Sequence, residues 1–377
     1  MAKPPETKTK SLIKNPYFLL AAVLLVFALG FDGWMYAANR QPMAADRPDI
    51  PKVKSAELAA SSTPVLDIAA YNKKILDIAN EPALATSSAS STASLSAAGK
   101  SLTAAVPLWP VKTVYPNAGA LLPFNRIVAY YGNLYSKNMG VLGEYPEDEM
   151  LARLSSEVSK WQAADPATPV IPALHYIAVV AQAGPGKTGK YISRMPDSEI
   201  DKVLAMAGKI HGLVFLDVQV GQSSVEAEVP LLEKYLKLPN VHLGIDPEFA
   251  MDNGRRPGTV IGTLDASDIN FAANYLAQIA KANNLPPKIL VVHRFTQGMV
   301  TNYQKITPLP EVQIVMDMDG FGSPAKKIST YKSFIYREPV QFTGFKLFYK
   351  NDTARGGMMT PDQILKLTPI PVYIQYQ

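Results

Sequence analysis

Five carboxylic acids in the C-terminal two-thirds of the sequence stand at the ends of short apolar runs: Asp217, Asp246, Glu248, Asp317 and Asp319. Side chains alternate between the two faces of a strand, so Asp217 shares a face with Phe215, and Asp319 with Asp317. Carboxyl groups that converge on one place raise one another's pKa, and such a set can divide into a proton donor and an ionised partner. The pattern therefore predicts proton transfer by carboxylates. For Asp217, taken by itself, the alternative is a structural role as a helix cap or an ion-pair partner.

Other polar side chains end or closely follow the same kind of run, and we predict that they bind a substrate. They are Tyr131, Asn133, Gln219, His293, Arg294, Lys346, Gln375 and Tyr376. The alternative for His293 and Arg294 is that they only pair with the acids, and for Asp319, which precedes a glycine, that it forms a turn.

The runs that carry these residues are rich in β-branched and aromatic residues and predict eight strands. They span residues 126–132, 174–181, 212–219, 241–246, 289–294, 312–319, 342–349 and 371–376. Their starts are roughly 25–50 residues apart, which leaves room for a helix between most pairs.

Several intervening segments have the pattern of helices: residues 146–163, 197–210, 224–235, 267–283 and 361–367. Alternation of apolar strands and helices predicts a parallel sheet covered by helices. Eight units favour closure into an α/β (β/α)8 TIM barrel over an open sheet, and in such barrels the active site lies at the carboxyl ends of the strands. Because the sequence ends directly after the eighth strand, we expect residues 106–123 to cover the place of a final helix.

The segment Asp246-Pro247-Glu248 at the end of the fourth strand resembles the Asp-x-Glu of lysozyme-type and chitinase-type barrel glycoside hydrolases. The resemblance implies that Glu248 is the acid/base and that Asp246 orients it. The sequence departs from the chitinase pattern before this strand, where Val241-His242-Leu243-Gly244-Ile245 stands. It also lacks the acid of the lysozyme type on the first strand.

Other chemistries have weaker support. No cysteine is present, which removes disulfides, thiolate zinc sites and a cysteine nucleophile. Of the four histidines, we expect His175, His211 and His242 at the opposite end of the barrel from the acids, so we predict no metal and no other cofactor. A divalent cation on Asp317 and Asp319 is the alternative. Gly184-Pro185-Gly186-Lys187-Thr188 lacks the first glycine of a phosphate-binding loop.

The N-terminal region predicts export. Residues 17–38 form an apolar segment long enough to cross a bilayer, and the lysines before it predict a cytoplasmic N-terminus, residues 1–16. The rest of the chain would lie outside the cell membrane, or be secreted if the segment is a cleaved signal peptide. Residues 39–105 read as an Ala/Ser/Pro-rich stalk with a short helix at 64–80, either a spacer or a self-association helix, and residues 106–377 as the barrel domain.

Together these patterns predict a membrane-anchored glycoside hydrolase that acts on cell-envelope or extracellular glycan. The first alternative is a non-catalytic glycan-binding barrel, in which cations such as Arg255, Arg294 or Lys346 would neutralise the acids. A metal-dependent phosphoesterase or deacetylase is the second. The net charge of +5 is concentrated near the N-terminus, so we predict no nucleic-acid partner.

Overall fold

A computed structural model describes residues 65–81, 107–251 and 253–377. Within them, eight parallel strands form a closed barrel, because β1 (Arg126–Gly132) pairs with both its neighbour in sequence, β2, and the last strand, β11. The other strands of the barrel follow in order: β2 Val170–Ala181, β4 Leu213–Val218, β5 Val241–Ile245, β7 Lys288–Arg294, β9 Val312–Met318, β10 Phe342–Leu347 and β11 Tyr373–Tyr376. The predicted (β/α)8 fold and all eight predicted strands are confirmed.

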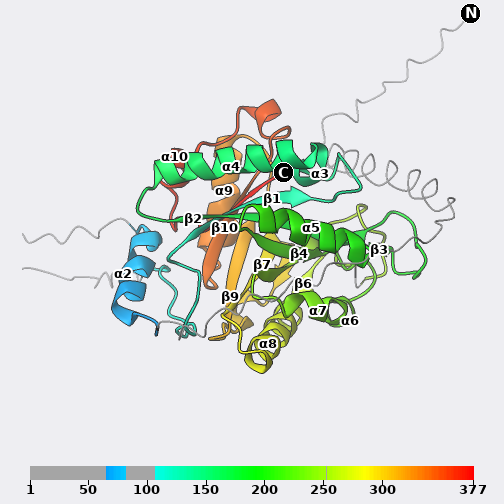
Figure 1. Ribbon diagram of the computed structural model, residues 1–377, viewed down its shortest axis with the longest axis horizontal. Helices are drawn as coiled ribbons and strands as arrows, with labels where there is room; N and C mark the ends of the chain where they lie inside the picture. The colour runs from blue at the N-terminus through cyan, green and yellow to red at the C-terminus, as the bar shows by residue number, and fades with distance from the viewer. Residues whose placement is uncertain (1–64, 82–106, 252) are drawn as a thin grey trace, which may run out of the picture.

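The helices lie around the strands (Figure 1). They are α3 Val141–Glu144, α4 Glu147–Ala164, α5 Asp197–Lys209, α6 Val225–Glu228, α7 Glu233–Leu236, α8 Ala266–Ala282, α9 Pro324–Tyr331 and α10 Pro361–Ile364. Between β7 and β9 the chain forms short 3-10 turns in place of an α-helix. The strand β3 (Ile192–Arg194) is antiparallel to β2, and β6 (Leu264–Asp265) pairs with β8 (Val300–Thr301) outside the barrel.

Helix α4 illustrates how the outer layer forms. Its first turn is acidic, which favours the N-terminal end of a helix dipole. Met150, Leu154 and Trp161 recur at helical spacing and are fully buried against the barrel. The indole N–H of Trp161 donates to the hydroxyl of Tyr376 at 2.9 Å, so α4 reaches the outer face of the last strand.

The interior of the barrel has its own apolar core, closed at the amino ends of the strands by Leu122. This residue is fully buried among the inward-facing side chains of the strands. The side-chain amide of Gln313 also accepts from the backbone N–H of Leu122 at 3.1 Å and donates to the carbonyl of Leu122 at 2.6 Å. Residues 106–123, which were expected to cover the place of a final helix, place Leu122 in the amino end of the barrel. The helix that contacts Tyr376 of the last strand is α4.

Helix α2 (Ile68–Ala79) lies within the residues predicted as a short helix, 64–80, and it packs on the barrel. Ile75 and Ile78 contact the interior core, and the side-chain amide of Asn80 donates to the carbonyl of Leu367 at 2.8 Å. The predicted membrane segment, residues 17–38, lies outside the described residues. Among the helices that are described, none is long and apolar enough to cross a membrane.

Candidate active site

The polar residues of the site stand above the apolar core because they follow core residues on the same face of their strands. Asp217 comes two residues after Phe215, and His293 two residues after Val291. This alternation produces a charged layer above the apolar one, at the carboxyl ends of the strands. Asp217, His293 and Asp317 are all fully buried there.

A cavity of about 560 Å³ opens above this layer. Six of the predicted site residues are among those that line it: Tyr131, Gln219, Asp246, Glu248, Asp319 and Lys346. Much of the remaining wall is apolar and aromatic, with Phe249, Phe295, Phe321, Phe334 and Phe348 among its residues. The cavity thus combines three carboxyl groups with flat rings that can stack on a substrate.

Asp246 and Glu248 are joined by a tight turn. Asp246 precedes the 3-10 turn Pro247–Phe249, and its Oδ1 accepts from the backbone N–H of Glu248 at 3.0 Å. Burial raises the pKa of Asp246 to about 7, opposed by His293 and assisted by Asp217 and Asp319. Burial, Asp246 and Asp319 likewise raise the pKa of Glu248 well above its usual value. Both groups therefore keep their protons to a higher pH than a free carboxyl group does.

Asp319 differs because it has cationic partners. Its Oδ2 lies 3.1 Å from Nζ of Lys346 and 3.2 Å from Nδ1 of His293. Burial would raise the pKa of Asp319, but Lys346 and His293 outweigh that effect and hold it below its usual value. The Lys346 ammonium also lies 3.8 Å from the centre of the Tyr131 ring.

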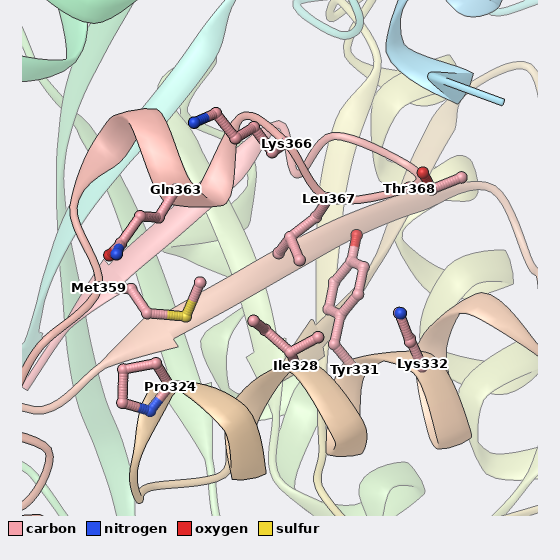
Figure 2. A pocket seen from close by; sticks show the side chains of 9 residues that line it. All are labelled: Pro324, Ile328, Tyr331, Lys332, Met359, Gln363, Lys366, Leu367 and Thr368. Atoms are coloured by element: carbon pink, nitrogen blue, oxygen red, sulfur yellow. The ribbon is translucent and has the colours of Figure 1, made fainter. Parts of the chain in front are cut away.

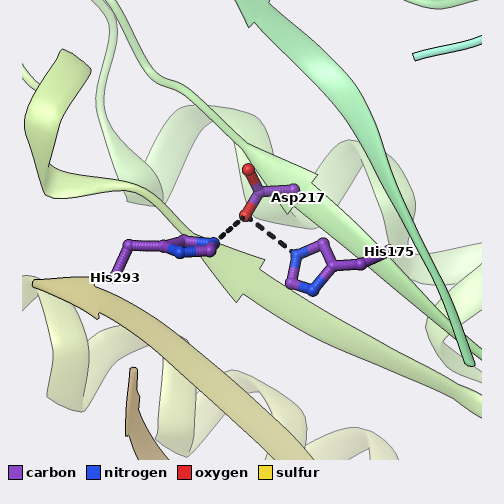
Figure 3. Close-up of side chains that lie close together, drawn as sticks. All are labelled: His175, Asp217 and His293. Atoms are coloured by element: carbon purple, nitrogen blue, oxygen red, sulfur yellow. Dashed lines mark ion pairs between the residues drawn. The ribbon is translucent and has the colours of Figure 1, made fainter. Parts of the chain in front are cut away.

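His175, Asp217 and His293 lie beneath the floor of the cavity and are fully buried. Figure 3 shows how their side chains come together. One oxygen of Asp217 lies 3.2 Å from Nε2 of His175 and 3.4 Å from Nε2 of His293. Burial lowers the pKa of His175 to about 4, and the nearby acids raise the pKa of His293 above its usual value despite burial. One ligand atom from each side chain falls within 4.8 Å of the others, so these residues can hold a metal ion.

Two strand glycines make room for this layer. A Cβ on Gly244 would stand 2.4 Å from both Oδ1 of Asp217 and Nε2 of His175. A Cβ on Gly344 would stand 2.5 Å from Oδ1 of Asp317. The missing side chains on β5 and β10 are therefore a condition for burying the two aspartates.

The structure brings ten of the thirteen predicted site residues together. Six line the cavity, as given above, and Asp217, Asp317 and His293 lie directly beneath it. Gln375 is also buried, at 3.1 Å from Nδ1 of His175. Oδ2 of Asp317 lies 3.4 Å from Nδ1 of His293. Burial raises the pKa of Asp317, although His293 opposes the shift.

The other three predicted residues do not line the cavity. Asn133 shapes the turn after β1, where its amide donates to the carbonyl of Ile177 and accepts from the N–H of Tyr135. Arg294 faces outward and pairs with Glu338 at 2.6 Å. Tyr376 packs against Trp161, also on the outside of the barrel. Arg294 and Tyr376 point outward because each follows an inward-facing neighbour, His293 or Gln375.

The expected place of His175 is wrong. The strand β2 begins at Val170, four residues earlier than the predicted start, so His175 lies in its middle, opposite Tyr131 and Phe215. Its side chain lies beside Asp217, at the opposite end of the barrel from the one predicted. Tyr373, whose hydroxyl is 2.6 Å from Nδ1 of His175, was likewise not among the predicted residues.

A second cavity, of about 360 Å³, lies between α9 and α10 (Figure 2). Its charged side chains are Lys332 and Lys366, and neither an acid nor a histidine lines it. It offers no pair of groups for proton transfer, so the barrel cavity is the better candidate for chemistry.

No protein-family model and no curated protein matches the sequence. Among solved structures, orotidine 5′-monophosphate decarboxylase from Methanocaldococcus jannaschii is 11% identical with a TM-score of 0.32, over 67% of this chain and 89% of that one. The mannanase BCman from Bacillus subtilis is 11% identical with a TM-score of 0.35, over 68% of this chain and 81% of that one. At these values neither match indicates an activity for this chain.

Proposed function

We propose that the barrel is a glycoside-hydrolase-like enzyme in which Glu248 is the general acid. The observation that supports this most is the unequal pairing of the three carboxyl groups in one cavity. Lys346 and His293 contact Asp319, whereas no cation among the described residues forms an ion pair with Glu248 or Asp246. An acid kept protonated beside an ionised carboxylate is the arrangement that glycoside hydrolysis requires.

Each carboxyl group has a distinct part in this proposal. Glu248, half-buried at the cavity wall, would protonate the glycosidic oxygen as the bond breaks. Asp246 would fix the Glu248 backbone through the 3.0 Å hydrogen bond. Asp319 would stabilise the positive charge that develops on the sugar, or activate water as the second carboxylate. The ion pair to Lys346 would keep it ionised.

The pairing also favours a hydrolase over a non-catalytic binding barrel. A binding module was expected to have its acids neutralised by Arg255, Arg294 or Lys346. Arg294 instead pairs with Glu338, and Lys346 reaches one lining carboxylate of the three. Two acids are left free to exchange a proton with a ligand. The predicted export of the barrel favours a cell-envelope or extracellular glycan as the substrate.

The test is hydrolysis of peptidoglycan and a panel of polysaccharides by the full chain and by Glu248→Gln. We expect the variant to lose at least about 100-fold in rate, the lower end of a general acid's contribution. Glu226→Gln is the matched control, because Glu226 is exposed on α6 and does not line the cavity. Saturable glycan binding without hydrolysis, unchanged in Glu248→Gln, would favour the binding module.

A further inference from the structure

His175, Asp217 and His293 converge on one point from three different strands of the barrel. Both Nε2 atoms face the same oxygen of Asp217, at 3.2 and 3.4 Å (Figure 3). All three side chains are fully buried. Yet apart from these contacts with one another, the two nitrogens and this oxygen have no hydrogen-bond partner among the described residues. Buried polar atoms without a partner are costly, so their common orientation calls for a ligand between them.

Contacts on the outer side hold the same three side chains in this orientation. Nδ1 of His175 is 2.6 Å from the hydroxyl of Tyr373. Nδ1 of His293 is 3.2 Å from a carboxylate oxygen of Asp319. The second oxygen of Asp217 accepts from the hydroxyl of Tyr131 at 3.0 Å. Outer partners that orient a histidine through Nδ1 and leave Nε2 directed inward are characteristic of metal ligands.

Distances and charge agree with a metal ion. Nitrogen and oxygen ligands lie about 2.0–2.2 Å from tetrahedral zinc, which places neighbouring ligands about 3.3 Å apart. The two measured separations, 3.2 and 3.4 Å, lie on either side of that value. Three carboxyl groups, on Asp217, Asp317 and Asp319, surround His293, and Lys346 pairs with one of them, Asp319. A divalent ion would supply positive charge where the carboxyl groups gather.

We propose that His175, Asp217 and His293 bind a divalent transition-metal ion of the zinc type inside the barrel. The ion lies one layer below the cavity floor, where it fixes Asp217 and, through Asp217, the hydroxyl of Tyr131. Through His293 it also holds Asp319, whose carboxylate lines the cavity. This proposal does not depend on the proposed hydrolysis, because metal binding is measured without any substrate.

The experiment is to strip the full chain with a chelator, add Zn²⁺, and measure retained metal and the Kd by calorimetry. We expect one ion per chain, and a loss of affinity of at least about 100-fold in His175→Gln, the upper limit for losing an outer partner. His242→Gln is the matched control. His242 is also buried, but its Nδ1 accepts from the backbone N–H of Ile289 nearer the amino ends of the strands. It should bind as the parent does.

Nuclear magnetic resonance of the histidine rings keeps the test decisive if His175→Gln does not fold. The chain has four histidines, so their ring signals can be assigned. Zn²⁺ should shift the Nε2 signals of His175 and His293 and leave His242 unchanged. The proposal is overturned if the folded parent retains no stoichiometric Zn²⁺ and His293 carries a proton on both ring nitrogens. It is also overturned if His211→Gln, at the exposed histidine, abolishes binding.

Discussion

Replacing Gly244 with alanine tests whether the charged layer depends on the space that this glycine leaves. The added Cβ would stand 2.4 Å from Oδ1 of Asp217 and from Nε2 of His175, about 1 Å closer than an ordinary contact. Neither neighbour can move freely, because Asp217 is held by Tyr131 and His175 by Tyr373. Overpacking of this size costs about 1–3 kcal/mol of stability, and a 1 Å misplacement of a site can reduce a rate about 100-fold.

The assay compares Gly244→Ala with the parent in thermal unfolding, Zn²⁺ binding and glycan hydrolysis. Gly208→Ala is the matched control, since Gly208 lies in α5 and a Cβ there meets nothing within 4 Å. We expect Gly208→Ala to match the parent and Gly244→Ala to lose both Zn²⁺ binding and activity. A folded Gly244→Ala with parental binding and activity would refute the claim that space at this glycine positions the site.

Three further predictions follow from single residues. Asp246→Asn should be more stable than the parent at pH 8, by up to a few kcal/mol, and lose this advantage at pH 4. The folded pKa of Asp246 is about 7, so the parent loses stability as the pH rises from about 4 to 7. The charged groups that face Asp246 are Asp217, Glu248, Asp319, Lys346 and His293. Urea unfolding at both pH values measures the difference. Lys346→Met should lower kcat/KM at least about 10-fold by removing the cation from Asp319, whereas Lys326→Met at the exposed rim should have little effect; equal effects would contradict this role. Leu122→Ala should cost about 2–5 kcal/mol in chemical unfolding, and Leu108→Ala, 44% exposed, under about 0.5 kcal/mol.

The barrel strands were predictable because their apolar runs are dense and bounded by turn residues. The start of β2 was not predictable, because Pro172 lies near the beginning of the strand Val170–Ala181 and cannot donate a backbone hydrogen bond. That one boundary concealed His175. Helix α9 also escaped prediction, since it is only eight residues long and the residues it buries are Lys327 and Tyr331, neither of them aliphatic.

Within the site, alternation along each strand already favoured an inward Asp217 and Asp319. Applied more strictly, it would have excluded Arg294 and Tyr376. What the sequence could not provide is the pairing of acids with cations. Lys346 reaches Asp319 because β10 pairs with β9 in a register that sets Phe345 beside Met318. Registers between strands about 30 residues apart depend on the packing of the whole barrel.

The central claim, that Glu248 is a general acid, is tested most directly by the rates of the parent and Glu248→Gln on aryl glycosides with different leaving groups. A general acid matters most when the leaving group is a poor one. We predict a loss of at least about 100-fold in Glu248→Gln with a poor leaving group, and much less with 2,4-dinitrophenolate, which needs no proton. An equal loss on all substrates, or no hydrolysis of any glycoside by the parent, would contradict the claim.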